Sequence, residues 1–72
     1  MKTVEQLMQE AFDRPRDPRS VAYKAGVRRA LAFRLDGRLV CDPYPPGSAE
    51  SDAFHAGTQE GHAIFRREQE WA

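Results

Sequence analysis

Two short blocks constrain the fold of this chain more than any other feature of its sequence. Each places an aromatic residue three positions before a glycine, in Ala22-Tyr23-Lys24-Ala25-Gly26 and in Ala53-Phe54-His55-Ala56-Gly57. Because glycine has no side chain, a helix that carries one on its inner face lets another backbone come close. We therefore expect two helices that cross near Gly26 and Gly57.

The length of the chain limits it to one small domain, which we assign to residues 1–72. With 72 residues and 40% hydrophobic content, its core contributes only a few kcal/mol to stability. Formation of a homodimer, or docking on a larger partner, would bury further apolar surface. We keep both among the expected interactions.

Charge is distributed unevenly although it sums to zero. Residues 14–38 contain eight basic and two acidic side chains, a net charge of +6, whereas residues 41–72 contain two basic and six acidic side chains, a net charge of −4. A basic segment of this kind suits an anionic partner, and an acidic one suits a basic partner. The chain is therefore polarised along its length.

The first expected element is an amphipathic helix from Thr3 to Phe12, which forms the N-terminal part of the domain (residues 1–13). Thr3 and Gln6 have the spacing of a capping box. Apolar residues then recur at intervals of three and four, at Val4, Leu7, Met8, Ala11 and Phe12. Two prolines in residues 14–19 end this helix and make a stiff linker.

A second helix is expected from Ser20 to Leu35, with Asp36-Gly37 as its end. Its inner face would carry Tyr23, Val27, Ala30 and Phe33. The segment 31–41 also fits a β-hairpin with Asp36-Gly37 in the turn. We favour the helix, because the apolar stripe continues unbroken from Tyr23.

The last helix is expected from Ser48 to Gln69, after a connector that prolines keep extended over residues 42–47. Its inner face would carry Phe54, Gly57, Gly61 and Ile64. The predicted fold is therefore all-α. In it, a pair of antiparallel helices within residues 20–69, joined by the proline-rich linker, follows the short N-terminal helix.

No pattern in the sequence predicts a catalytic or metal site. His55 and His62 lie two helical turns apart, about 10 Å along the axis, which is too far for one ion even with Cys41 nearby. No nucleophile–base constellation or phosphate-binding loop is recognisable, so we expect neither catalysis nor a cofactor. One cysteine and a polar start, without the apolar core of a signal peptide, favour the cytoplasm and no membrane partner.

Three motifs together resemble the ribosome modulation factor family, which also includes small proteins associated with ciprofloxacin resistance. The matching positions are Tyr23 and Gly26, then Cys41, Pro43 and Tyr44 in the connector, then Phe54 and Gly57. The resemblance spans residues 20–67. It implies two helices joined by an irregular linker and, for the founding members, binding to the small ribosomal subunit through its RNA, which favours ribosome dimers and silences translation. The helix from Thr3 to Phe12 is an addition to this pattern.

Two classes of function follow from these observations. In the first, the basic segment binds ribosomal RNA, with single-stranded bases stacking on the tyrosines; the residues are Arg16, Arg19, Tyr23, Lys24, Arg28, Arg29, Arg34 and Tyr44. In the second, the chain is a phage or mobile-element protein that inhibits a host protein or defence complex. Its acidic last helix would then face a basic partner through Asp52, His55 and Glu60. A third alternative is an enzyme that modifies fluoroquinolones, as claimed for some relatives.

Overall fold

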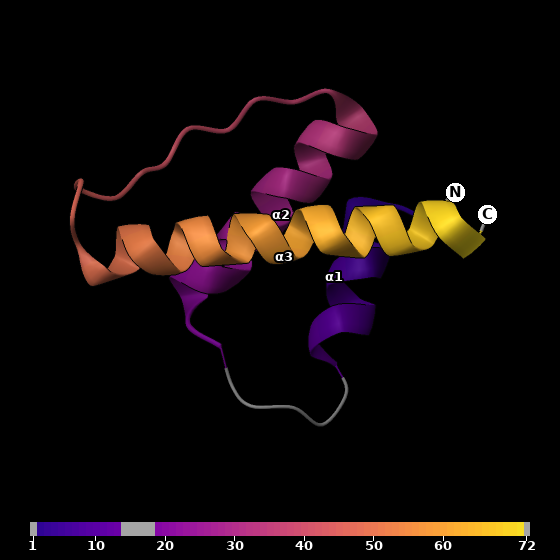
Figure 1. The fold of residues 1–72 in the computed structure, drawn as a ribbon, viewed down its shortest axis with the longest axis horizontal. Helices are drawn as coiled ribbons and strands as arrows, with labels where there is room; N and C mark the ends of the chain where they lie inside the picture. Colours follow the sequence, from indigo (N-terminus) through magenta and orange to yellow (C-terminus); the bar gives the residue numbers. More distant parts are fainter. Residues whose placement is uncertain (1, 14–18, 72) are drawn as a thin grey trace.

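Three helices make up the part of the protein that the computed structural model describes, residues 2–13 and 19–71. They are α1 (Val4–Phe12), α2 (Val21–Asp36) and α3 (Ala49–Trp71), shown in Figure 1. Among the described residues there are no strands, so the all-α prediction is confirmed. The molecule measures 37 × 30 × 17 Å along its principal axes.

The ends of the helices follow the predicted local signals. Thr3 and Gln6 form both hydrogen bonds of the capping box, and the hydroxyl of Ser20 accepts from the backbone N–H of Tyr23. Ser48 does the same for Ser51 at the start of α3. At the other end of α2, Gly37 has a φ of 68°, the left-handed conformation that ends helices. The alternative of a β-hairpin over residues 31–41 is therefore wrong.

The helices α2 and α3 cross where the glycines lie, as predicted. Atoms of Phe54 and Thr58 occupy the space where a side chain of Gly26 would lie, and the backbone of Tyr23 occupies that space at Gly57. A side-chain carbon on Gly61 would lie 2.6 Å from the carbonyl oxygen of Val27. Since real side chains do not tolerate such distances, only glycine permits this approach.

The expected antiparallel arrangement of this pair is not confirmed. Contacts advance together along both helices: Tyr23 meets Gly57, Val27 meets Gly61, and further along Arg34 donates a hydrogen bond to His62. α2 and α3 therefore run in the same general direction, and the connector returns past α2 to the end where α2 began (Figure 1).

The length of the connector explains this arrangement. Between Asp36 and Ala49 lie twelve residues, which in extended form span about 40 Å. The sixteen residues of α2 rise only about 24 Å. A short turn would force the next helix to fold back, but this extended segment reaches the far end of α2 with length to spare.

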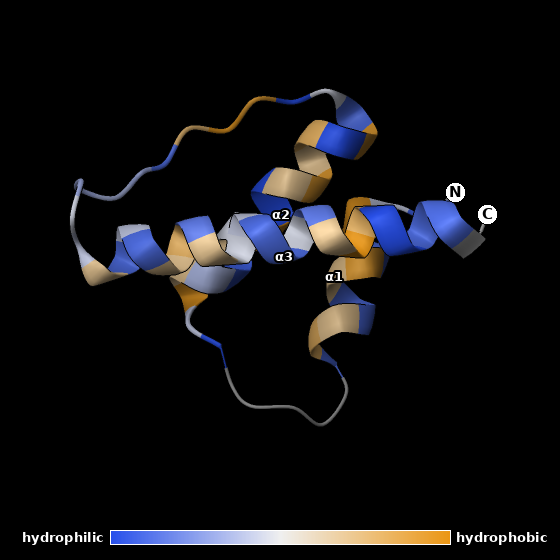
Figure 2. Ribbon diagram, in the orientation of Figure 1, coloured by the Kyte–Doolittle hydropathy of each residue, from blue (hydrophilic) through white to orange (hydrophobic). Residues whose placement is uncertain are grey.

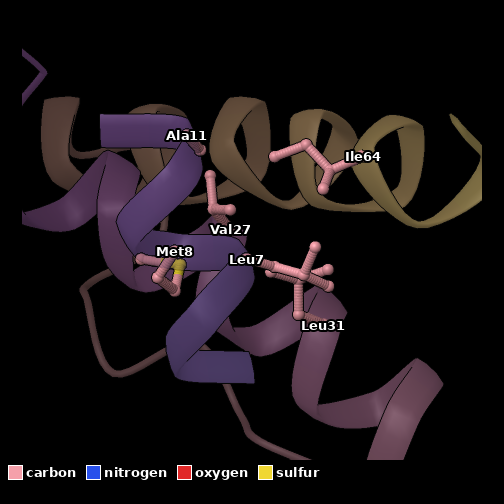
Figure 3. Close-up of a cluster of buried hydrophobic side chains, with 6 residues drawn as sticks. All are labelled: Leu7, Met8, Ala11, Val27, Leu31 and Ile64. Carbon is pink, nitrogen blue, oxygen red and sulfur yellow. The ribbon is translucent and has the colours of Figure 1, made fainter. Parts of the chain in front are cut away.

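Helix α1 covers one end of the crossing and completes the core. Figure 3 shows its Leu7, Met8 and Ala11 beside two side chains of α2 and one of α3, Val27, Leu31 and Ile64. Near the start of α3, Phe54 is also buried. The predicted inner faces are confirmed with one exception. Phe33, which we expected in the core, is 47% exposed, because the inner face of α2 is filled instead by Leu31 and by small residues.

Hydropathy along the structure shows where apolar side chains remain at the surface. None of the described helices combines the length and the apolar character that crossing a bilayer requires. Figure 2 shows an apolar stretch, drawn in orange, in the connector between α2 and α3. Its Leu39 and Val40 are exposed, and they belong to the site described next.

Candidate nucleic-acid interface

A pocket of about 380 Å³ lies between α2, the connector and α3. α2 contributes Arg29, Ala30 and Phe33, the connector contributes Leu39 and Val40, and α3 contributes His55, Thr58 and His62. We call this the connector pocket. It joins apolar and hydrogen-bonding side chains in one concave surface, which is the composition of a ligand site.

The apolar side of the connector pocket is unusually open to water. Phe33 is 47%, Leu39 81% and Val40 39% exposed. Within residues 2–13 and 19–70, only Val21 is a further large hydrophobic side chain with comparable exposure. Exposed apolar groups that gather in one place, rather than singly, mark a binding surface.

Three arginines act electrostatically on His62, which lines the pocket. Arg34 donates from Nε to Nδ1 of His62 over 3.2 Å, and its guanidinium lies 5.3 Å from the ring centre of Phe65. Burial lowers the pKa of His62 below its ordinary value, and the charges of Arg34, Arg66 and Arg29 lower it further. We call these three arginines the cationic cluster.

The hydrogen bond from Arg34 fixes the chemistry of His62. A neutral imidazole that accepts at Nδ1 carries its proton on Nε2, so His62 is a neutral hydrogen-bond donor near pH 7. The same bond, together with Phe65, orients the guanidinium of Arg34. Arg29 is similarly placed, 5.2 Å from the ring centre of Phe54.

Asp42 attaches the connector to α3 beside the pocket. Its carboxylate accepts from the buried hydroxyl of Ser51 over 2.7 Å and from the backbone N–H of Tyr44 over 2.9 Å. It also lies 3.3 Å from Nε2 of His55, as an ion pair when that ring is protonated. The hydrogen bond from Ser51, and then that from Tyr44, hold the pKa of Asp42 below its ordinary value.

The structure divides the basic residues that the sequence suggested. Arg29 and Arg34 belong to the cationic cluster. Arg28 instead pairs with Glu5 of α1, which lowers the pKa of that carboxyl, and Lys24 lies 5.5 Å from the ring centre of Phe12.

The remaining two predicted arginines lie elsewhere in the chain. Arg19 lies over the ring of Tyr23, 4.6 Å from its centre. Arg16 lies outside the described residues. Only part of the predicted basic surface therefore gathers at the pocket.

Both tyrosines that we expected to stack on bases take part in packing instead. The hydroxyl of Tyr23 donates to Glu60 over 2.6 Å. Tyr44 meets Phe54 edge to face, with ring centres 5.9 Å apart. Each side chain is half-buried. The aromatic ring that the interface exposes is Phe33.

The three residues of the alternative protein-binding surface all lie on α3. Asp52 is exposed in the first turn of α3. His55 lines the connector pocket beside Asp42, whereas Glu60 is bound to Tyr23 on another side of the same helix. Asp52 and His55 are one turn apart on α3, whereas the carboxylate of Glu60 is engaged by Tyr23.

Sequence reasoning missed six residues that the site uses, of which three come from the apolar side of the pocket: Phe33, Leu39, Val40, Thr58, His62 and Arg66. One signal for the polar members was available. His55, His62 and Arg66 follow each other at steps of seven and four, which places them on one face of a helix. No such signal existed for the connector residues, because the path of an extended segment has no periodicity.

The arrangement combines cationic, hydrogen-bonding and apolar side chains, which suits an anion next to an apolar ring. Within residues 2–13 and 19–71, no three side chains of histidine, cysteine, aspartate or glutamate gather as metal ligands. Comparison of the chain with protein-family models, with curated proteins and with solved structures finds no match.

Proposed function

We propose that this protein is a small, non-enzymatic RNA-binding module of the cytoplasm, and that its partner is ribosomal RNA. One observation carries the proposal: the cationic cluster adjoins a pocket with exposed apolar walls. The choice of the ribosome as partner rests on the resemblance of residues 20–67 to the ribosome modulation factor family. The same resemblance is the reason to propose a role in control of translation and in ribosome hibernation.

Physical chemistry favours RNA for such a surface. Guanidinium groups bind phosphate oxygens, often through two parallel hydrogen bonds, and arginines that are already oriented lose less freedom on binding. Arg29 and Arg34 are oriented in this way by aromatic rings. Apolar and aromatic side chains beside them suit the faces of unstacked bases. A net charge of zero does not oppose this, because phosphates respond to the local cluster.

Titration of a single-stranded ribosomal RNA fragment over a salt series tests the proposal. Arg34→Ala combined with Arg66→Ala removes two of the clustered charges. If both contact phosphates, the magnitude of the slope of log K against log salt falls by about 1.4. Arg67→Ala is the matched control for Arg66, since it removes the same charge from the next position, which lies on another face of α3.

Two results would contradict the proposal. One is the absence of measurable RNA affinity for the wild-type protein at low salt. The other is an equal loss of affinity for Arg66→Ala and Arg67→Ala, which would show that the cluster has no special role.

A pull-down from bacterial lysate, with and without nuclease, separates the remaining hypotheses. Capture of ribosomal particles that nuclease abolishes supports RNA binding. Capture of a host protein complex that survives nuclease supports the inhibitor hypothesis. Conversion of a fluoroquinolone by the purified protein would support the enzyme hypothesis.

A further inference from the structure

We infer that the connector pocket is a base-binding subsite that holds one unstacked nucleobase of single-stranded RNA, with the neighbouring phosphates on the cationic cluster. The inference rests on the proposed function and adds to it the strandedness of the RNA and the residue that recognises it. Its first support is the concave shape, since a hollow of about 380 Å³ accepts a single ring system. In a duplex the faces of the bases are stacked and inaccessible.

The polarity of the site orients such a nucleotide. At His62, Arg34 donates a hydrogen bond, and Arg66 follows one turn further along α3 and acts on the same ring electrostatically. His55, at the other side, is already accompanied by the carboxylate of Asp42. Arg29 acts on both Asp42 and His62, and the carboxylate offsets part of its charge on the side of Asp42. A phosphate is therefore attracted more strongly to the side of His62. The apolar walls between the two sides are left for the base.

The pocket also offers hydrogen-bonding groups for the edge of a base. Thr58 donates its hydroxyl proton to the carbonyl of Phe54, so its oxygen is left as an acceptor. His62 accepts from Arg34 at Nδ1 and presents Nε2–H as a donor. The two residues are one turn apart on α3 and line the same pocket. One donor and one acceptor match the Watson–Crick edge that only an unpaired base exposes.

Phe33 is the side chain that the structure assigns to stacking. It is 47% exposed on the wall of the pocket, and it is one helical turn from Arg29 on the same face of α2. About half of the surface of the Phe33 side chain is in contact with water and is therefore not buried by the fold. A base that stacks on this exposed surface of Phe33 buries it and so stabilises the complex.

The experiment compares a twelve-nucleotide single-stranded RNA with its blunt duplex by fluorescence anisotropy. We expect the wild-type protein to bind the single strand at least tenfold more tightly. Phe33→Ala should weaken binding to the single strand roughly 5- to 150-fold, the effect of losing one stacked base, and should leave duplex binding unchanged. Phe33→Trp should retain the preference.

Val21→Ala is the matched control, because Val21 is an exposed hydrophobic residue of α2 outside the connector pocket. The inference is overturned if Phe33→Ala binds the single strand as well as the wild type does, or if the wild type binds both RNAs equally. In either case a salt slope that depends on Arg34 and Arg66 would still support RNA binding. Absence of binding to both RNAs overturns the proposed function itself.

Discussion

At the scale of single residues, the crossing of α2 and α3 depends on the absence of side-chain atoms. Replacing Gly57 by alanine gains about 1 kcal/mol of helix propensity. Against this gain, the new carbon would collide with the carbonyl group of Tyr23. A backbone atom cannot rotate away as a flexible side chain does, so the helices must separate. The collision therefore outweighs the propensity.

We predict that Gly57→Ala lowers the stability of the protein, and that Gly57→Leu lowers it more, by roughly 1–3 kcal/mol or above. Thermal unfolding followed by circular dichroism measures the effect. Ala56→Leu, at the neighbouring exposed position of α3, is the control and should melt near the wild-type temperature. A Gly57→Leu variant as stable as the wild type would show that the helices do not touch here.

His62 predicts a pH dependence of stability. Its pKa is lowered in the folded protein, by burial first and then by Arg34, Arg66 and Arg29. Below pH 6.5 the unfolded chain binds a proton that the folded protein resists, so stability declines as the pH falls from about 6.5 toward the folded pKa. Above about pH 7 the imidazole is neutral in both the folded and the unfolded chain, so its titration no longer lowers stability.

Urea unfolding at pH 7 and at pH 5 tests this expectation, with His62→Gln as the comparison. The variant should lose the part of the decline that the imidazole causes. Asp42, whose pKa is also lowered, contributes to stability above its unfolded pKa near 4 and loses this only below it, so the two pH windows are distinct. Equal pH profiles for wild type and His62→Gln would contradict the assignment.

At the scale of elements, the connector is held in place by a few polar contacts rather than by regular structure. The carboxylate of Asp42 accepts hydrogen bonds from the hydroxyl of Ser51, whose side chain is buried, and from the backbone N–H of Tyr44. These bonds lie within a few residues of Leu39 and Val40. The same contacts therefore position one wall of the connector pocket.

We predict that Asp42→Ala speeds amide hydrogen exchange in the connector more than in α2, because the bonds that it removes are local to that segment. It should also weaken binding of single-stranded RNA. Asp52→Ala removes the same charge from an exposed position of α3 and is the control. Uniformly faster exchange over the whole chain would instead indicate global destabilisation.

The elements themselves could be predicted well from the sequence, because their signals are local. Thr3, Ser20 and Gly37 act on backbone groups a few residues away, and each does so as expected. The relative direction of α2 and α3 could not be predicted in this way. It depends on the path of twelve extended residues, which is fixed by distant partners such as Ser51.

The candidate site was predictable only in part, for a related reason. Arginines on α2 were identified from charge alone, but charge does not show which of them are paired within the fold. Arg28 meets Glu5 only because α1 packs against α2. Tyr23 likewise meets Glu60 across 37 positions of sequence. Whether an aromatic or charged residue is available to bind a partner therefore depends on tertiary contacts, which no local sequence pattern encodes.

At the scale of the whole molecule, α1 is a cover on the crossing of the other two helices. A domain of 72 residues has a stability of about 4–11 kcal/mol. Leu7 is 2% exposed and lies among side chains of all three helices, so Leu7→Ala should cost about 2–5 kcal/mol. The chain would then lie near the limit of folding.

Denaturant unfolding of Leu7→Ala measures this cost. Gln9→Ala, on the exposed side of the same helix, should leave the midpoint nearly unchanged. Equal unfolding midpoints for the two variants would mean that packing of α1 through Leu7 does not stabilise the core.

Reversing one surface charge distinguishes an RNA partner from a basic protein partner. Asp52 is exposed on α3, so Asp52→Lys should preserve the fold. For an RNA partner, the added positive charge speeds association at low salt; for a basic protein partner, it slows association. Stopped-flow kinetics with the partner found by pull-down decide between them. A rate within about twofold of the wild type would mean that this residue does not influence association.

The shared direction of α2 and α3 has a consequence for how the chain folds. In an antiparallel pair, the first contacts form beside the turn and the rest follow in order. Here the side-chain hydrogen bonds from Arg34 to His62 and from Tyr23 to Glu60 join described residues of the two helices that are 28 and 37 positions apart. A loop of that length must close before any contact compensates for the lost entropy. We therefore expect this protein to fold more slowly than an antiparallel helical bundle of equal size.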